Sequence, residues 1–109
     1  MANYNVFRVG NESSGYQLTV DGFSGNATDG MNGCREIYNH NSMKFSTRDR
    51  DNDHSSGSCA KSWPGAWWFS KCYCSHINLH GKGFVYWNYD RKPQIKCKNT
   101  KMRIKPLTP

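Results

Sequence analysis

The sequence lacks any long hydrophobic run. No apolar stretch in its 109 residues approaches the roughly 20 residues that a membrane-spanning helix needs, so an integral membrane protein is excluded. The first ten residues, MANYNVFRVG, have neither the basic start nor the apolar core of a secretory signal peptide. Internal repeats and low-complexity linkers are also missing. The length then accommodates one small domain at most.

Apolar residues of every kind are scarce. They make up only 36% of the chain, glycine occurs 10 times, and aromatic side chains supply much of the apolar volume. A helical bundle needs long amphipathic segments, which such a composition does not provide. The composition therefore favours a loop-rich fold based on strands.

Acidic residues are few beside basic ones, at 8 against 15, which gives a net charge of +7. Seven of the basic residues lie between Arg91 and Lys105. No nucleic-acid-binding motif accompanies them, so a nucleic-acid partner is not expected. Met102 and Ile104 alternate with Arg103 and Lys105, the pattern of a strand with one solvated face. The charge still favours acidic surfaces or anionic glycans as partners.

Cysteine, by contrast, is frequent. Five cysteines and two glycosylation sequons, at Asn11 and Asn26, indicate an oxidising compartment, and we expect an extracellular protein although this chain carries no export signal. Cys59 and Cys72 bracket an aromatic segment and are expected to pair. Closing that loop of about 14 residues is worth about 3 kcal/mol. The partners of Cys34, Cys74 and Cys97 stay open, and the odd count leaves one thiol unpaired or joined to another chain.

The apolar pattern predicts short strands separated by long loops. Residues 4–20 are predicted to form two strands around a polar turn at 10–15, and residues 21–42 a loop with room for one helical turn. Further strands are predicted at 43–45, 84–89 and 102–105. The segment WPGAWWF (63–69) is too aromatic for a solvated loop, so we expect Trp67, Trp68 and Trp87 in the core.

The richest chemistry lies in residues 45–60, FSTRDRDNDHSSGSCA, where Asp49, Asp51 and Asp53 alternate with other residues. Calcium needs several oxygen ligands at about 2.3–2.6 Å, and alternating carboxylates in an irregular loop can converge on one point. An EF-hand is excluded because His54 stands where its glycine is required and Ala60 where its bidentate glutamate is required. A solvated turn, neutralised by its own arginines, is the alternative.

The cysteines and histidines of the chain suggest two further kinds of site, a zinc site and a catalytic site. Cys72, Cys74, His76 and His80 form a Cys2His2 set, but their spacing is unusual, and four ligands on one flat strand converge poorly on a tetrahedron. Catalysis by a cysteine would need an activating base and an oxyanion hole, and the sequence marks neither. We therefore expect neither zinc nor enzymatic activity.

Several motifs together resemble one family. YQLTVDGFSGNATD (16–29), NSMKFSTRDRDND (41–53), SCAKSWPGAWWFSKCY (58–73) and TKMRIKP (100–106) closely resemble the C-terminal half of fibrinogen-related domains, as in ficolins and invertebrate lectin-like proteins. The resemblance implies an α+β fold, with a small antiparallel sheet and a loop-rich calcium-binding subdomain. Residues 1–109 would then be a partial domain without its N-terminal half.

The resemblance also implies a calcium site and a ligand site. Calcium would be held by the side chains of Asp51 and Asp53 and the carbonyls of Ser55 and Gly57, with Asp49 outside the ligand set. The ligand-binding residues expected beside it are Lys71, Cys72, Tyr73 and His76. Two departures bear on this pocket: Tyr73 replaces the family's usual histidine, and the loop after Leu79 is shorter than in many members.

The function implied is calcium-dependent, lectin-like binding of acetylated or anionic carbohydrate, in innate defence or cell-surface recognition. The alternative is a structural or protein-interaction module whose ligand pocket does not function. A degenerate gene fragment without function is a third interpretation. Oligomerisation through the missing N-terminal region would be compatible with the first two.

Overall fold

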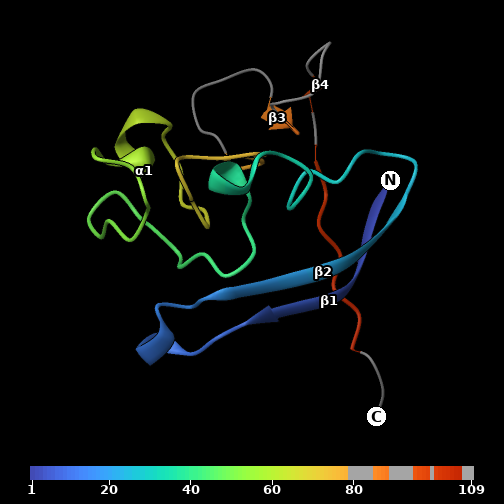
Figure 1. Ribbon diagram of the computed structural model, residues 1–109, viewed down its shortest axis with the longest axis horizontal. Helices are drawn as coiled ribbons and strands as arrows, with labels where there is room; N and C mark the ends of the chain where they lie inside the picture. The colour runs from blue at the N-terminus through green and yellow to red at the C-terminus, as the bar shows by residue number, and fades with distance from the viewer. Residues whose placement is uncertain (79–84, 89–94, 99, 107–109) are drawn as a thin grey trace.

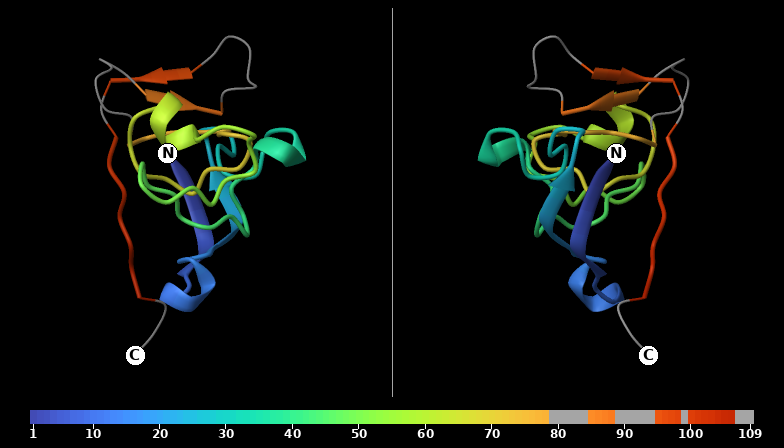
Figure 2. Two further views of the ribbon diagram at one scale, coloured as in Figure 1. Left: turned by 90° about the vertical axis from the view of Figure 1, so that its left-hand side faces the viewer. Right: turned by 90° about the vertical axis from the view of Figure 1, so that its right-hand side faces the viewer.

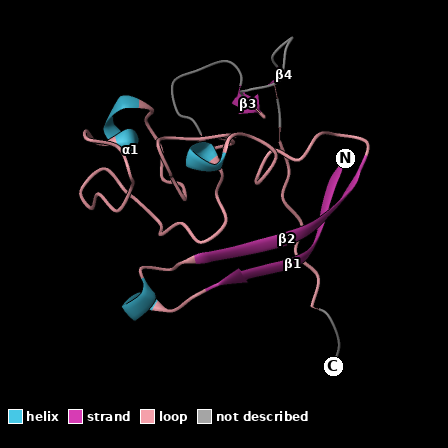
Figure 3. Cartoon of the chain, in the orientation of Figure 1, coloured by secondary structure: helices cyan, strands magenta, loops and turns pink. Residues whose placement is uncertain are grey.

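The computed structural model describes residues 1–78, 85–88, 95–98 and 100–106. Within these ranges, two antiparallel strand pairs and three short helical segments stand among long irregular loops (Figures 1 and 3). In chain order the elements are β1 (Ala2–Val9), η1 (Glu12–Ser14), β2 (Leu18–Gly25), η2 (Glu36–Tyr38), α1 (Cys59–Ser62), β3 (Val85–Trp87) and β4 (Ile95–Cys97). Among these described residues, no helix is long and apolar enough to cross a membrane.

The β1–β2 hairpin is the longest regular element. Its register runs from Val9 opposite Leu18 to Ala2 opposite Gly25. In β2, Leu18 and Val20 are buried while Thr19 and Asp21 are exposed, as the period of two requires. The predicted strand pair is therefore present. It is longer than predicted, and Tyr16 lies outside it.

A small aromatic core lies between the hairpin and the loops. Its buried apolar members are Leu18, Val20, Met31, Cys59, Ala60, Trp67, Phe69 and Tyr73. Trp67 is almost fully buried, and Trp68 and Trp87 are half-buried against the same cluster, so all three tryptophans expected there contribute to it. Aromatic contacts supply the packing that few aliphatic side chains are available to provide.

Two disulfides hold the irregular body together. Cys59 and Cys72 are bridged, with Cα atoms 5.3 Å apart, and Cys34 and Cys74 are bridged, with Cα atoms 5.8 Å apart. Cys97 is a free thiol. The first bridge is the pairing expected from the sequence. The second joins residues 40 positions apart, and the sequence alone does not predict this pairing.

The predicted strand at 102–105 is wrong. Residues 101–106 are irregular and exposed, and they run from the β4 end of the molecule past the hairpin (Figure 2). Ile104 and Met102 are 73% and 49% exposed. Among the described residues, this segment pairs with no strand, and an alternating pattern without a partner edge does not form one.

The strand predicted at 43–45 is also wrong, and the strand predicted at 84–89 lies partly outside the described residues. Residues 43–45 form no strand, and the isolated bridges nearby begin after them, at Ser46, which pairs with Trp67, and at Thr47, which pairs with Arg50. The strand predicted at 84–89 is present as β3, which pairs antiparallel with β4, but its first and last residues lie outside the described part. Residues 21–42 contain the end of β2 and the short η2 helix as well as loop.

Candidate ligand-binding site around the acidic loop

The acidic loop begins at a fixed point on the core. The backbones of Ser46 and Trp67 exchange two hydrogen bonds, of 2.9 and 3.2 Å, and Thr47 and Arg50 exchange two more, of 3.0 and 3.1 Å. The side-chain amide of Asn52 donates a hydrogen bond to the Phe45 carbonyl at 2.9 Å. These bonds set the entry of the loop before its acidic residues are reached.

The carboxylates of Asp51 and Asp53 lie next to each other. Asp51 Oδ1 accepts from the Asp53 N–H at 3.1 Å, while Asp53 accepts from the N–H groups of Ser55 at 2.9 Å and Cys59 at 2.8 Å. Partial burial raises the pKa of Asp53, and the nearby Asp51 carboxyl raises it further, although the two backbone N–H donors oppose this shift. Such paired acids disfavour each other's ionisation and favour a cation between them.

The loop offers oxygen donors of the kind that hard cations bind. Asp51 is exposed, Asp53 is half-buried, and the surroundings of Gly57 are open. Within the described ranges, no group of three or more His, Cys, Asp or Glu side chains could hold a metal ion. A metal here would therefore depend on two carboxylates with carbonyls and water, a mixed oxygen shell that calcium accepts.

The zinc set is not formed. Cys72 and Cys74 are each taken by a disulfide, which removes their thiolates as ligands. His80 lies outside the described residues. The ring of His76 is instead buried among aromatic residues, with Nε2 3.2 Å from the Trp63 carbonyl oxygen.

The segment expected to bind ligand lies beside the acidic loop. The Cys59–Cys72 bridge joins the end of the loop to it, and His54 donates its N–H to the Ser70 carbonyl at 2.9 Å. Lys71 is exposed, with its N–H bonded to the Ile37 carbonyl at 3.1 Å. Covalent and hydrogen-bonded links thus make the two segments neighbours.

The expected ligand-binding residues differ sharply in access to solvent. Lys71 is exposed and Cys72 half-buried, whereas Tyr73 is 7% exposed and His76 is fully buried. The Tyr73 ring contacts Trp63 edge-on, and its centroid lies 5.5 Å from the centroid of the His76 ring. A ligand from solvent would meet Lys71 and the backbone of the segment before it met either ring.

His40 is a buried polar residue that belongs to no motif recognisable in the sequence. Its Nδ1 bonds the Trp68 carbonyl at 2.8 Å, and its Nε2 accepts from the N–H groups of Cys74 and Ser75 at 3.0 Å each. Burial lowers the pKa of His40 to about 4, helped by the nearby His76 ring, while the backbone bonds oppose the shift. The neutral ring therefore holds the backbone that follows Tyr73.

The chain matches a known protein family over almost its whole length. The family model "Fibrinogen beta and gamma chains, C-terminal globular domain" matches residues 1–107. The chain belongs to this family. Its domains are generally non-enzymatic, and the two disulfides fit the secreted proteins typical of fibrinogen-like homologues.

Relatives match this fibrinogen-family chain with only part of their length. Fibrinogen-like protein 1 of Rattus norvegicus is 43% identical over 82 residues, which cover 71% of this chain and 26% of the relative. Fibrinogen C domain-containing protein 1 of Homo sapiens is 36% identical over 110 residues, or 94% of this chain and 23% of the relative. The chain thus spans about a quarter of the length of these curated relatives.

Solved structures support the same family fold. The fibrinogen-like globe domain of human ANGPTL2 is 33% identical and superimposes with a TM-score of 0.72, covering 89% of this chain and 47% of that one. The lamprey fibrin D-dimer, in complex with the peptide ligand Gly-His-Arg-Pro-amide, is 32% identical with a TM-score of 0.59, over 75% of this chain and 29% of that one.

Proposed function

We propose that this chain is a calcium-dependent extracellular recognition module that binds acetylated or anionic carbohydrate. The observation that carries the proposal is the link between acids and ligand segment. Asp53 accepts the N–H of Cys59, and Cys59 is bridged to Cys72. Ordering of the acids by a cation would therefore be transmitted to the segment of Lys71.

In this proposal, Asp51 and Asp53 bind calcium with their side chains, and Ser55 and Gly57 contribute backbone carbonyls. Calcium supplies positive charge that cancels the repulsion between the two carboxylates and fixes the loop. Lys71 then attracts the negative charge of an anionic glycan, and the backbone of Cys72 and Tyr73 contacts the ligand. His76 is fully buried and packs against Tyr73, so it would support the segment without contacting the ligand.

The test compares Asp51→Asn with Asp49→Asn. Asp51 is exposed and, among the described residues, accepts one hydrogen bond, from the Asp53 N–H, so its loss should spare the fold, whereas Asp53 anchors Ser55 and Cys59. Isothermal titration should show calcium binding in the wild type and in Asp49→Asn, and at least about tenfold weaker binding in Asp51→Asn. Equal affinity in all three proteins would remove the calcium assignment.

Glycan binding is tested separately, on a resin carrying acetylated sugar. Retention of the wild type in calcium buffer and elution by chelator support the lectin-like function. Lys71→Gln should weaken retention on an anionic glycan more than on a neutral acetylated sugar, because it removes only charge. Retention that ignores the chelator would contradict the coupling between calcium and ligand.

A protein-interaction module is the second candidate. It is favoured by the burial of Tyr73 and His76. It is also favoured by Ile37, which is 52% exposed and lies next to Lys71. The lamprey relative binds a peptide. A chain that binds calcium but neither acetylated nor anionic glycan would point to this candidate.

A further inference from the structure

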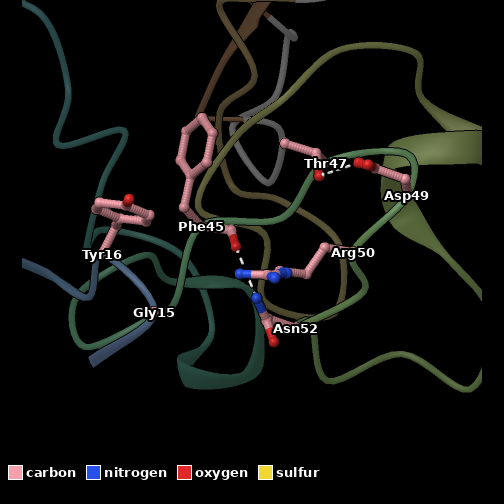
Figure 4. Close-up of a pocket in the computed structure, with 7 residues that line it drawn as sticks. All are labelled: Gly15, Tyr16, Phe45, Thr47, Asp49, Arg50 and Asn52. Carbon is pink, nitrogen blue, oxygen red and sulfur yellow. Dashed lines mark hydrogen bonds between the residues drawn. The ribbon is translucent and has the colours of Figure 1, made fainter. Parts of the chain in front are cut away.

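A cleft lies where the acidic loop meets the turn between β1 and β2, and none of the residues assigned to calcium or glycan lines it. Its volume is about 220 Å³, and Figure 4 shows the residues around it. One wall is formed by Gly15 and Tyr16, from the turn between β1 and β2. The other is formed by Phe45, Thr47, Asp49, Arg50 and Asn52.

Tyr16 is held in an uncommon backbone conformation. Its φ is +55°, directly after Gly15 at +74°. The Tyr16 N–H donates to the Asn11 carbonyl at 3.0 Å, and the Trp68 indole N–H donates to the Tyr16 carbonyl at 3.0 Å. A left-handed residue other than glycine costs about 1–3 kcal/mol and is kept where the surroundings enforce it. The result is a tyrosine that is 43% exposed at the cleft.

The two walls are fixed to each other. Phe45 donates its N–H to the Gly15 carbonyl at 2.9 Å, and its ring packs edge-on against Trp68 with ring centroids 5.2 Å apart. Trp68 in turn bonds Tyr16. The aromatic side of the cleft is therefore formed without a ligand, which lowers the ordering cost of binding.

The polar side carries both signs of charge. Asp49 accepts from the Thr47 hydroxyl at 2.6 Å, a bond that, with the nearby Arg50 cation, keeps the pKa of Asp49 low. Within the described part of the chain, the guanidinium of Arg50 has no hydrogen-bonded or ion-paired partner. In Figure 4 the Arg50 side chain extends toward Phe45 and Asn52.

This chemistry matches a neutral sugar ring. Adjacent hydroxyl groups both donate and accept, and the cleft offers a carboxylate, a guanidinium and an amide to meet them. An aromatic ring suits the apolar C–H face of the sugar. Opposite charges side by side give no advantage to a ligand with net charge. The volume is below that of pockets for drug-sized ligands, which suits one ring.

We propose that this cleft is a second carbohydrate site, which binds one neutral hexose ring between Tyr16 and the polar side chains of Asp49, Arg50 and Asn52. The site goes beyond the proposed function, because it needs neither an acetyl group nor an anionic one. A branched glycan could then contact the protein at two places, one at Lys71 and one here.

The experiment is an NMR titration of the full chain in calcium buffer with methyl glucoside, methyl mannoside and methyl galactoside. Binding of at least one should saturate with a millimolar Kd and shift the resonances of Tyr16, the Arg50 side chain and the Asn52 amide. Tyr16→Asn removes the ring but tolerates positive φ, so it should fold and bind at least about tenfold more weakly. Tyr16→Phe keeps the ring and should bind within about threefold of the wild type.

Tyr38→Asn is the matched control, since it removes a tyrosine beside Arg35, outside the cleft. It should leave the affinity unchanged. No saturable shift with any of the three sugars, equal affinity in Tyr16→Asn and wild type, or preference for methyl glucuronide would overturn the proposal. Because shifts at residues 71–73 report the other site, failure of one site is distinguishable from failure of the other.

Discussion

Two regions of this chain place their apolar residues in different ways. Residues 18–76 place Leu18, Phe69 and His76 fully out of solvent and close two disulfides around them. Residues 100–106 instead leave Met102 and Ile104 exposed. A cavity of about 740 Å³ lies between that segment and β1. The first region buries its apolar residues among disulfides and aromatic rings, whereas the second lies over a cavity.

Core packing should give the largest contrast. Phe69→Ala removes a fully buried ring and should lower the free energy of unfolding by about 3–5 kcal/mol. Ile104→Ala, at a site 73% exposed, should change it by less than about 0.5 kcal/mol. Urea denaturation followed by tryptophan fluorescence measures both. A comparable loss in both variants would show that the C-terminal segment is packed in solution.

Acid should lower the free energy of unfolding through protonation of the buried His40. Its folded pKa of about 4 lies below its unfolded value of 6.5, so the unfolded state binds the proton first. This contribution is complete above about pH 6.5 and is lost as the pH falls toward 4, by up to about 3 kcal/mol. Urea midpoints measured across that range should fall in the wild type. They should fall less steeply in His40→Gln, although that variant is less stable throughout; parallel profiles would contradict the assignment.

The smallest effect is expected at the contact between β3 and the loop after β2. The Trp87 indole N–H donates to the Thr28 carbonyl at 2.7 Å and ties β3 to the loop after β2. Trp87→Phe leaves that carbonyl without its donor, at a cost of about 1–2 kcal/mol. Hydrogen exchange should become faster in β3 and β4 and stay unchanged in β1 and β2. Faster exchange in both pairs would mean that they unfold as one unit.

Local patterns predicted the parts of the fold that depend on neighbours in sequence. The alternation of Leu18 and Val20 located β2, and the aromatic run located Trp67 in the core. The same alternation failed at Met102 and Ile104, because a strand also needs an edge to pair with. Period alone also placed Tyr16 in a strand, although its backbone is left-handed.

The site was predictable only in its local pieces. The adjacency of Asp51 and Asp53 follows from their spacing, and the bridge that joins their loop to Lys71 was expected. His40 and the Cys34–Cys74 bridge depend on contacts across 34 to 40 residues, which no local pattern encodes. The cleft at Tyr16 depends likewise on a turn and a loop that meet only in the folded chain.

The two disulfides are nested, since Cys59 and Cys72 both lie between Cys34 and Cys74 in sequence. The acidic loop therefore belongs to a closed covalent ring. A protease that cuts the chain once between Cys34 and Cys74 releases no fragment, and a cut between Cys59 and Cys72 leaves the acidic loop in a ring that both bridges close. Nicked protein would migrate as an intact chain until it is reduced, and a cut before the acidic loop would leave that loop attached to the hairpin through Cys34.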